Sequence, residues 1–334
     1  MPLASIAGME SVRHALAGIL FLTFVLCSNV VPPPSASQDN NSQKSASTAG
    51  PVQTVMKNVM YHFTDTIAVH IHFLQGELDP THPPQIVTFD DRESFLLNMA
   101  YSEIAVGRDS LGHTLNEKVF AASDAPIKAV TVQIKENTLV IKGKLHQKGD
   151  LPFETTGTVS PTPDGRIRLH SEKVKAAHLP VKGLMDLLGI EITNLINTRK
   201  VAGVSAEKDD LILDPQFTFP PPQIKGRVTA VRLQGSEIVL TFGEKQPSNF
   251  AAKVSGNFMA YRGNELAFGR LTMHDTDMTL IDMDPQDPFD FFLDHYKDEL
   301  VAGYSKITPS NGLRVYMRDY SKLKNKTAGQ VSTH

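Results

Sequence analysis

Short segments in which hydrophobic residues occupy every second position recur along most of this sequence. In the first clear example, these positions are Ile67, Val69, Ile71 and Phe73. A period of two places such side chains on one face of a β-strand. A chain with many such segments must bury those faces in sheets, and short connections join the strands most simply in antiparallel order. The sequence therefore predicts a sheet-rich fold.

Three pairs of alternating segments predict β-hairpins. They cover residues 127–145, 153–174 and 226–242, and their turns fall at residues 135–137, 161–165 and 234–236. The turns contain Gly, Pro, Asp, Asn or Ser, which supply turn geometry or local hydrogen bonds. These hairpins predict an antiparallel meander.

Three other segments show helical signals. Residues 93–99 follow the candidate caps Asp90 and Asp91, residues 181–197 carry a wide apolar stripe, and residues 289–304 follow Asp287 as cap and Pro288 as first helical residue. Together with the hairpins they predict an α+β fold in which curved antiparallel sheets pack on amphipathic helices. The pattern leaves open whether the chain contains two similar sub-domains.

The first 36 residues predict a signal peptide or N-terminal anchor. Their apolar stretch, residues 15–27, is shorter than the roughly 20 residues of a membrane-spanning helix. We therefore expect an extracytoplasmic location, either periplasmic or anchored to the membrane and facing the periplasm. Lipidation at Cys27 is an alternative, although Leu26 stands where lipoprotein signals usually have a small residue.

Composition divides the rest of the chain. Residues 32–52 are rich in Ser, Asn, Gln and Pro and have almost no large apolar residues, so we expect a flexible linker at residues 37–54. Residues 55–243 hold the meander and a helix, and form the expected lipid-binding domain. Residues 244–321 predict a C-terminal α+β subdomain, and the polar residues 322–334 predict a disordered tail.

Charge and cysteine content exclude several classes of function. The chain has 33 Lys and Arg against 36 Asp and Glu and no long basic stripe, so we expect no nucleic acid as partner. One cysteine can form neither an internal disulfide nor a cysteine-based zinc site. The sequence also lacks a Gly-x-Ser-x-Gly elbow and a glycine-rich phosphate loop, and we expect no cofactor.

Two groups of side chains suggest metal binding. Alternation places His70 and His72 on one strand face, where two imidazoles could hold a metal in an envelope hydrolase, or could simply line a solvated face. The second group is acidic and consists of Asp275, Asp277, Asp282, Asp284, Asp287 and Asp290. It suits calcium but lacks the glycine and glutamate of an EF-hand loop, so capping of a helix N-terminus is the alternative.

The order of elements resembles that of bacterial lipid-binding members of the tubular lipid-binding (TULIP) superfamily. The resemblance covers residues 55–243 and lies in the meander, the helix VKGLMDLLGIEITNLI, the strand LILDP and the hairpin GRVTAVRLQGSEIVLTFG. It implies a curved sheet around a long helix and an apolar groove for acyl chains, with no covalent chemistry. Residues 250–325 lie outside the resemblance.

We therefore expect an exported protein that binds a lipid or another apolar molecule. The predicted lining residues are Leu184, Leu187, Leu188, Leu195, Val231, Leu233, Leu240 and Phe242. The same residues could instead fill an ordinary core. Membrane-surface contact through Lys322, Lys324 and Lys326 is a further expectation, with a solvated tail as its alternative. A structural or adaptor protein that recruits a partner at a sheet edge is the third functional hypothesis.

Overall fold

The computed structural model describes residues 49–125, 127–146, 149–176, 179–181, 202–207, 209–245, 250 and 254–323. The predicted signal segment, the predicted helix at 181–197 except its first residue, and the tail beyond Leu323 lie outside these residues.

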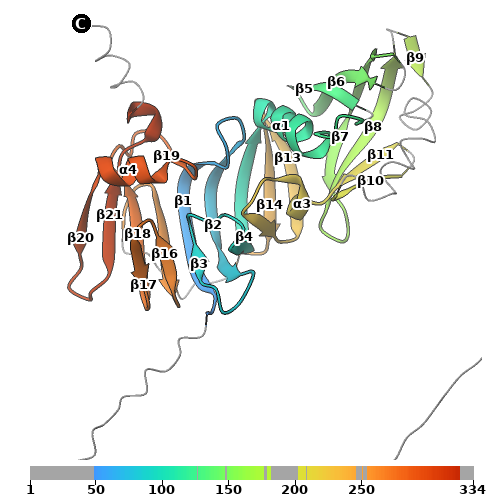
Figure 1. Cartoon of the computed structure of the whole chain (residues 1–334). Helices are drawn as coiled ribbons and strands as arrows, with labels where there is room; N and C mark the ends of the chain where they lie inside the picture. Colours follow the sequence, from blue (N-terminus) through green and yellow to red (C-terminus); the bar gives the residue numbers. More distant parts are fainter. Residues whose placement is uncertain are drawn as a thin grey trace, which may run out of the picture. The chain divides into compact units, whose positions relative to one another are not determined.

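The largest sheet has eleven strands and joins the N-terminal and C-terminal parts of the described chain (Figure 1). Its main path runs β13-β14-β4-β2-β1-β15-β18-β21-β20, while β12 pairs with β4 and β19 pairs with β1. The strands of the path are β13 (Val228–Gln234), β14 (Glu237–Gly243), β4 (Phe95–Gly107), β2 (Ala68–Pro80), β1 (Val52–His62), β15 (Phe258–Gly263), β18 (Thr276–Asp282), β21 (Leu313–Met317) and β20 (Tyr304–Ile307). The two added strands are β12 (Gln223–Lys225) and β19 (Phe289–Phe292). Because β1 pairs with β15 on one side and β2 on the other, this sheet crosses the predicted boundary at residues 243 and 244.

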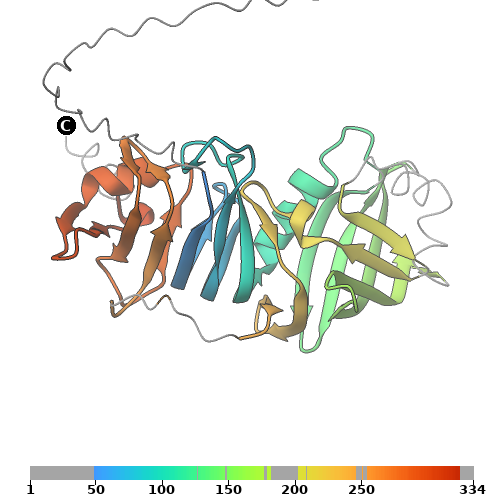
Figure 2. The same cartoon turned by 90° about the horizontal axis from the view of Figure 1, so that it is seen from below.

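A second sheet has seven strands in the order β10-β11-β8-β7-β6-β5, with β9 paired to β8. Its strands are β5 (Ile127–Lys135), β6 (Thr138–Leu145), β7 (Leu151–Pro161), β8 (Ile167–Ala176), β9 (Leu179–Val181), β10 (Val204–Glu207) and β11 (Asp210–Leu213). In Figure 2 the yellow strands β10 and β11 lie beside the green strands of the meander. The helix α1 (Arg108–Thr114) continues into the π-helix η1 (Leu115–Val119), and α1 packs against β5.

The remaining elements are short. Strands β3 (Val87–Thr88), β16 (Leu266–Phe268) and β17 (Leu271–Met273) form a three-stranded sheet. Helix α3 (Pro215–Thr218) begins after Asp214, whose side chain accepts a hydrogen bond from the backbone N–H of Gln216. Helix α4 (Tyr296–Ala302) lies between β19 and β20.

The structure confirms the predicted fold class, since curved and mainly antiparallel sheets make up most of the described chain. The three predicted hairpins correspond to β5–β6, β7–β8 and β13–β14. Each of them contains a register irregularity, and such bulges bend and twist a strand. Curvature therefore follows from local breaks in the ladders.

The helix predicted at residues 93–99 is wrong, because this segment opens strand β4. Phe95, Leu97 and Met99 are buried at every second position, and they face the core while β4 pairs with β2. Phe95, Leu96 and Met99 have the i+3 and i+4 spacings of a helix over the same short stretch, so periodicity alone could not decide.

The single helix predicted at residues 289–304 is also wrong. Its first part is strand β19, which pairs in parallel with β1, and only Tyr296–Ala302 is helical. Phe289 and Phe291 are fully buried on one face of β19. Aromatic residues at alternate positions favour a strand, and pairing with β1 outweighs the start signal of Asp287 and Pro288.

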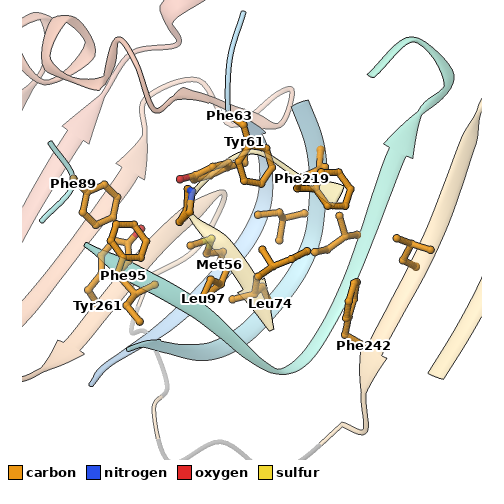
Figure 3. A pocket seen from close by; sticks show the side chains of 17 residues that line it. Met56, Tyr61, Phe63, Leu74, Phe89, Phe95, Leu97, Phe219, Phe242 and Tyr261 are labelled. Carbon is orange, nitrogen blue, oxygen red and sulfur yellow. The ribbon is translucent and has the colours of Figure 1, made fainter. Parts of the chain in front are cut away.

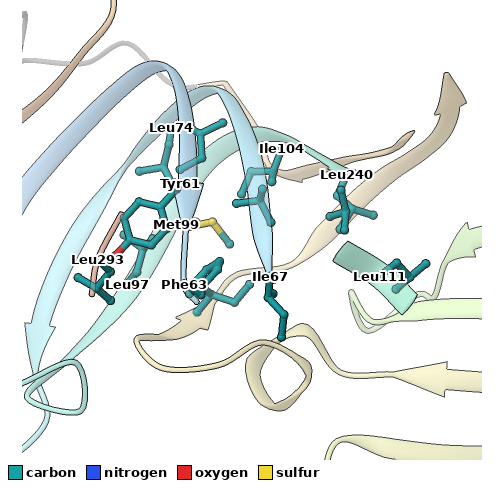
Figure 4. Packing of buried hydrophobic residues seen from close by; sticks show 14 of the residues in the cluster. Tyr61, Phe63, Ile67, Leu74, Leu97, Met99, Ile104, Leu111, Leu240 and Leu293 are labelled. Carbon is teal, nitrogen blue, oxygen red and sulfur yellow. The ribbon is translucent and has the colours of Figure 1, made fainter. Parts of the chain in front are cut away.

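One hydrophobic cluster spans both large sheets. Figure 4 shows members of the cluster from β1, β2, β4, β14 and α1. The cluster also includes residues of the seven-stranded sheet. Backbone contacts also connect the sheets, since the N–H of Val228 donates to the carbonyl of Gly165 at 2.9 Å. The Arg227 guanidinium adds a hydrogen bond to the carbonyl of Pro163 at 2.7 Å. The turn between β7 and β8 is thus fixed to the start of β13.

Candidate functional site

The first cavity lies within the core of the eleven-stranded sheet and has a volume of about 30 Å³. Seventeen residues line it, all of them apolar or aromatic, and Figure 3 shows their side chains. Phe242 lies on strand β14, Phe63 follows the end of β1, and Phe219 follows the end of α3. Burial raises the pKa of Tyr61 and Tyr261, so both phenols are neutral. The space is apolar and close to the size of one water molecule.

The second cavity lies between η1 and the seven-stranded sheet, and its volume is about 50 Å³. Eight of its ten lining residues are hydrophobic, namely Leu115, Phe120, Ile127, Val130, Ile141, Phe153, Leu169 and Leu211. The other two are Thr155 and Ser171. The Thr155 hydroxyl is buried without a hydrogen-bond partner in the described structure. A buried hydroxyl without a partner costs about 1–3 kcal/mol of folding free energy. It is therefore free to donate or accept a hydrogen bond to a bound molecule.

Asn116 attaches η1 to strand β5 next to this cavity. Its side-chain amide donates to the carbonyl of Val130 at 2.8 Å, and its side-chain oxygen accepts from the N–H of Val130 at 2.8 Å. Val130 lies in the register shift of β5, where the ladder to β6 is interrupted. The side chain therefore satisfies backbone groups that the bulge leaves free. A π-helix is a rare element and is frequent at functional sites.

The predicted ligand-binding residues fall into three groups. Leu240 and Phe242 line the first cavity and are almost fully buried. Val231 and Leu233 on β13 are half-buried and pack against the main cluster, outside both linings. Leu184, Leu187, Leu188 and Leu195 lie outside the described residues. Ligand binding by all eight residues stays a prediction.

Sequence reasoning missed the residues that form the second cavity. Phe153, Leu169 and Leu211 come from three different strands of one sheet. The sequence placed all three in predicted strands, but nothing in it showed that η1 would cover them. Asn116 gave no local signal either, because its partner Val130 lies in a bulge.

His70 and His72 lie on β2 with ring centroids 4.5 Å apart, as alternation predicted. The His70 Nε2 contacts the side-chain oxygen of Asn58 at 2.8 Å, and the His72 Nδ1 contacts Glu103 at 2.9 Å. Burial, followed by the neighbouring His72, lowers the pKa of His70. In the described part of the chain, neither histidine belongs to a group of three metal-ligating side chains. The metal prediction therefore has no third ligand there.

Such a group does occur in the acidic segment, at Asp284, Asp287 and Asp319, whose oxygens lie within 4.8 Å of one another. The first two belong to the predicted acidic set, whereas Asp319 comes from the C-terminal end. The Lys322 ammonium contacts all three carboxylates, at 2.8 Å from Asp319 and 3.3 Å from Asp287, with a closer contact to Asp284. This cation neutralises part of the cluster.

Buried carboxyl groups lie near that cluster. Glu299 is fully buried, its Oε1 accepts a hydrogen bond from the N–H of Phe292 at 2.8 Å, and burial raises its pKa to about 9. Burial likewise raises the pKa of Asp282 to about 6 and that of Asp319 above its usual range. Glu299 is therefore protonated at neutral pH, and it connects β19 to α4 as an uncharged acceptor.

Helices in the described ranges are all too short or too polar to span a bilayer. Comparison of the chain with protein-family models, with curated proteins and with solved structures gives no match.

Proposed function

We propose that the protein binds the acyl chain of a lipid, or a similar apolar molecule, between η1 and the seven-stranded sheet, and performs no covalent chemistry on it. The second cavity carries this proposal, because eight hydrophobic side chains surround one unpaired hydroxyl. Ligand sites commonly combine such an apolar lining with a few polar groups. The proposal agrees with the resemblance to TULIP proteins and with an envelope location, both of which remain expectations.

Uptake of an acyl chain requires the cavity to enlarge. Its volume of about 50 Å³ holds only a small part of such a chain. Separation of η1 from the sheet would open it, because Leu115 and Phe120 form its wall on that side. Each methylene of the acyl chain that then leaves water contributes about 0.8 kcal/mol to binding. Several methylenes together therefore offset the free-energy cost of separating η1 from the sheet.

The test uses the full chain after removal of bound lipid and a fluorescent fatty acid as probe. Thr155→Leu adds a larger apolar side chain where the unpaired hydroxyl stands, and we expect it to weaken probe binding at least tenfold. Thr155→Val is the matched control, because it keeps the shape of the side chain and leaves the cavity in place. We expect this control to bind the probe at least tenfold more tightly than Thr155→Leu, and any loss relative to the original chain measures the hydrogen bond of the hydroxyl.

Thermal unfolding of both variants shows whether the fold persists. Mass spectrometry of an organic extract from the unaltered protein supplies a second measurement, and we expect it to recover a lipid. The proposal is refuted if the extract holds no lipid and the probe does not bind. It is also refuted if a folded Thr155→Leu variant binds the probe as tightly as Thr155→Val.

A further inference from the structure

Lysines gather on the outer face of the seven-stranded sheet, where strands β5, β6, β7 and β8 lie side by side (Figure 1). Residues that pair across strands share a sheet face, and so do residues two apart along a strand. Lys142 pairs with Glu154, and Glu154 pairs with Lys175, on the face opposite to the buried Phe153. The same register places six lysines on this outer face, which we call the basic face: Lys128, Lys135, Lys142, Lys144, Lys173 and Lys175.

The charge of this face differs from that of the whole chain, which has a net charge of -3. Glu154 lies at its centre, with its carboxylate 3.2 Å from the Lys142 ammonium and 3.8 Å from that of Lys175. Within the described residues, Lys135, Lys144 and Lys173 form no ion pair, and all three are exposed. Positive charge therefore remains on the face after its own pairs are formed.

Two of the lysines oppose each other directly. Lys128 on β5 pairs in register with Lys144 on β6. Like charges in this position destabilise a sheet, so the protein alone carries a cost that an anion would offset. The Lys128 ammonium donates to the carbonyl of Ser123 at 2.7 Å, which holds one of the two charges in place. The arrangement is more favourable with a negatively charged partner than without one.

The face also contains a pocket of about 340 Å³. Lys142, Lys144 and Lys175 belong to its lining, together with Ala129 in the bulge of β5. The bulge interrupts the ladder between β5 and β6 and leaves space beside the lysines. A phosphate group in this space would accept charge-assisted hydrogen bonds from the ammonium groups around it.

The residue types on the face favour a membrane surface over nucleic acid. All six cations are lysines, which act as point charges and lack the bidentate geometry of arginine. Within the described parts of β5 to β8, the only Phe, Tyr or Trp is Phe153, which is buried on the other side. Sites for single-stranded nucleic acid stack bases on exposed aromatic rings. The lysines instead cover four adjacent strands, a width of about 14 Å, as contact with a layer of lipid headgroups requires.

We propose that the basic face docks the protein onto a membrane surface that contains anionic phospholipid, with one headgroup phosphate in the pocket between Lys142, Lys144 and Lys175. This goes beyond the proposed function and does not depend on it, because the apolar cavity lies on the opposite face of the sheet. The interaction is electrostatic, so we expect it to weaken as salt is added.

The experiment measures partitioning of the full chain into two kinds of vesicle by flotation. One kind consists of phosphatidylcholine alone, and the other of phosphatidylcholine and phosphatidylglycerol in equal amounts. Each lysine close to an anionic bilayer strengthens binding about fivefold, so we expect a preference of about a hundredfold or more for the anionic vesicles. The neutral vesicles measure every contribution that does not depend on lipid charge.

The triple variant Lys135→Gln/Lys144→Gln/Lys173→Gln removes the three lysines without an ion pair and keeps both contacts of Glu154. Its matched control is Lys57→Gln/Lys225→Gln/Lys245→Gln, which changes the net charge equally at exposed positions outside the basic face. We expect the preference for anionic vesicles to fall about tenfold or more in the first variant and to change less than about threefold in the control. Thermal unfolding shows that both variants are folded.

Three results would overturn the membrane contact. The unaltered chain could partition equally into both kinds of vesicle, or the two triple variants could show the same preference, which would indicate an effect of net charge alone. A single-stranded oligonucleotide could also bind more tightly than the anionic vesicles and depend on the same three lysines, which would identify nucleic acid as the partner. None of these results involves the fluorescent fatty acid, so binding in the apolar cavity is decided separately.

Discussion

Replacement of the buried Glu299 by glutamine provides a direct test of the charge state inferred for the core. The pKa of this carboxyl is about 9 in the folded chain, against an ordinary value of 4.5. Between pH 4.5 and pH 7 the unfolded chain releases the proton and the folded chain retains it. Folding then loses about 1.4 kcal/mol of stability for each pH unit, or about 3 kcal/mol by pH 7.

Glu299→Gln keeps the acceptor for the Phe292 N–H and has no proton to lose. The variant should therefore gain stability relative to the original chain as the pH rises, by about 3 kcal/mol between pH 4.5 and pH 7. Urea denaturation of both proteins across that range measures the change. Glu172→Gln is the control, because it makes the same chemical change at an exposed position of the other large sheet, on β8. Stability curves that stay parallel for Glu299→Gln and the original chain would refute the neutral buried carboxyl.

Three further predictions concern stability measured by thermal unfolding. Lys322→Gln should cost about 1–3 kcal/mol at pH 7, because the buried Asp319 loses its ion partner, and the loss should shrink in acid as Asp319 is protonated. A cost that does not change with pH would contradict this. Gly157→Ala should cost more than the roughly 1–3 kcal/mol of ordinary overpacking, because its Cβ would lie 1.8 Å from the His170 carbonyl oxygen. Gly112→Ala in α1 should instead raise the free energy of unfolding by up to about 1 kcal/mol, since the atom nearest to its added Cβ, the Val130 carbonyl oxygen, is 3.7 Å away. Equal effects of the two alanine substitutions would show that the close approach at Gly157 is unimportant.

The sequence was most informative where strand partners are close in the chain. Alternation and turn residues located the hairpins β5–β6, β7–β8 and β13–β14, since each turn brings its strands into register. Period analysis failed at Phe95 and at Phe289, where short apolar runs fit both a helix and a strand. At both positions, pairing with a strand elsewhere in the sequence decides between helix and strand.

The candidate site was less predictable than the hairpins. Leu240 and Phe242 could be identified as inward-facing because they alternate on β14, and both line the first cavity. The second cavity depends on the pairing of β8 with β7 and β11 and on the bulge in β5, where Asn116 attaches η1. A bulge shifts the alternation by one residue, and single-sequence patterns carry no information about which strand contains it.

The pairing of β1 with β15 has a consequence for synthesis of the protein. When β1 leaves the ribosome, β2 follows within a few residues, but β15 begins only at Phe258, about 200 residues after β1 ends. At about 5–20 residues per second, translation of that interval takes on the order of 10–40 s. Throughout it, the nascent chain exposes one unpaired edge of β1 to other proteins. A chaperone that covers extended backbone would be of most use during this interval.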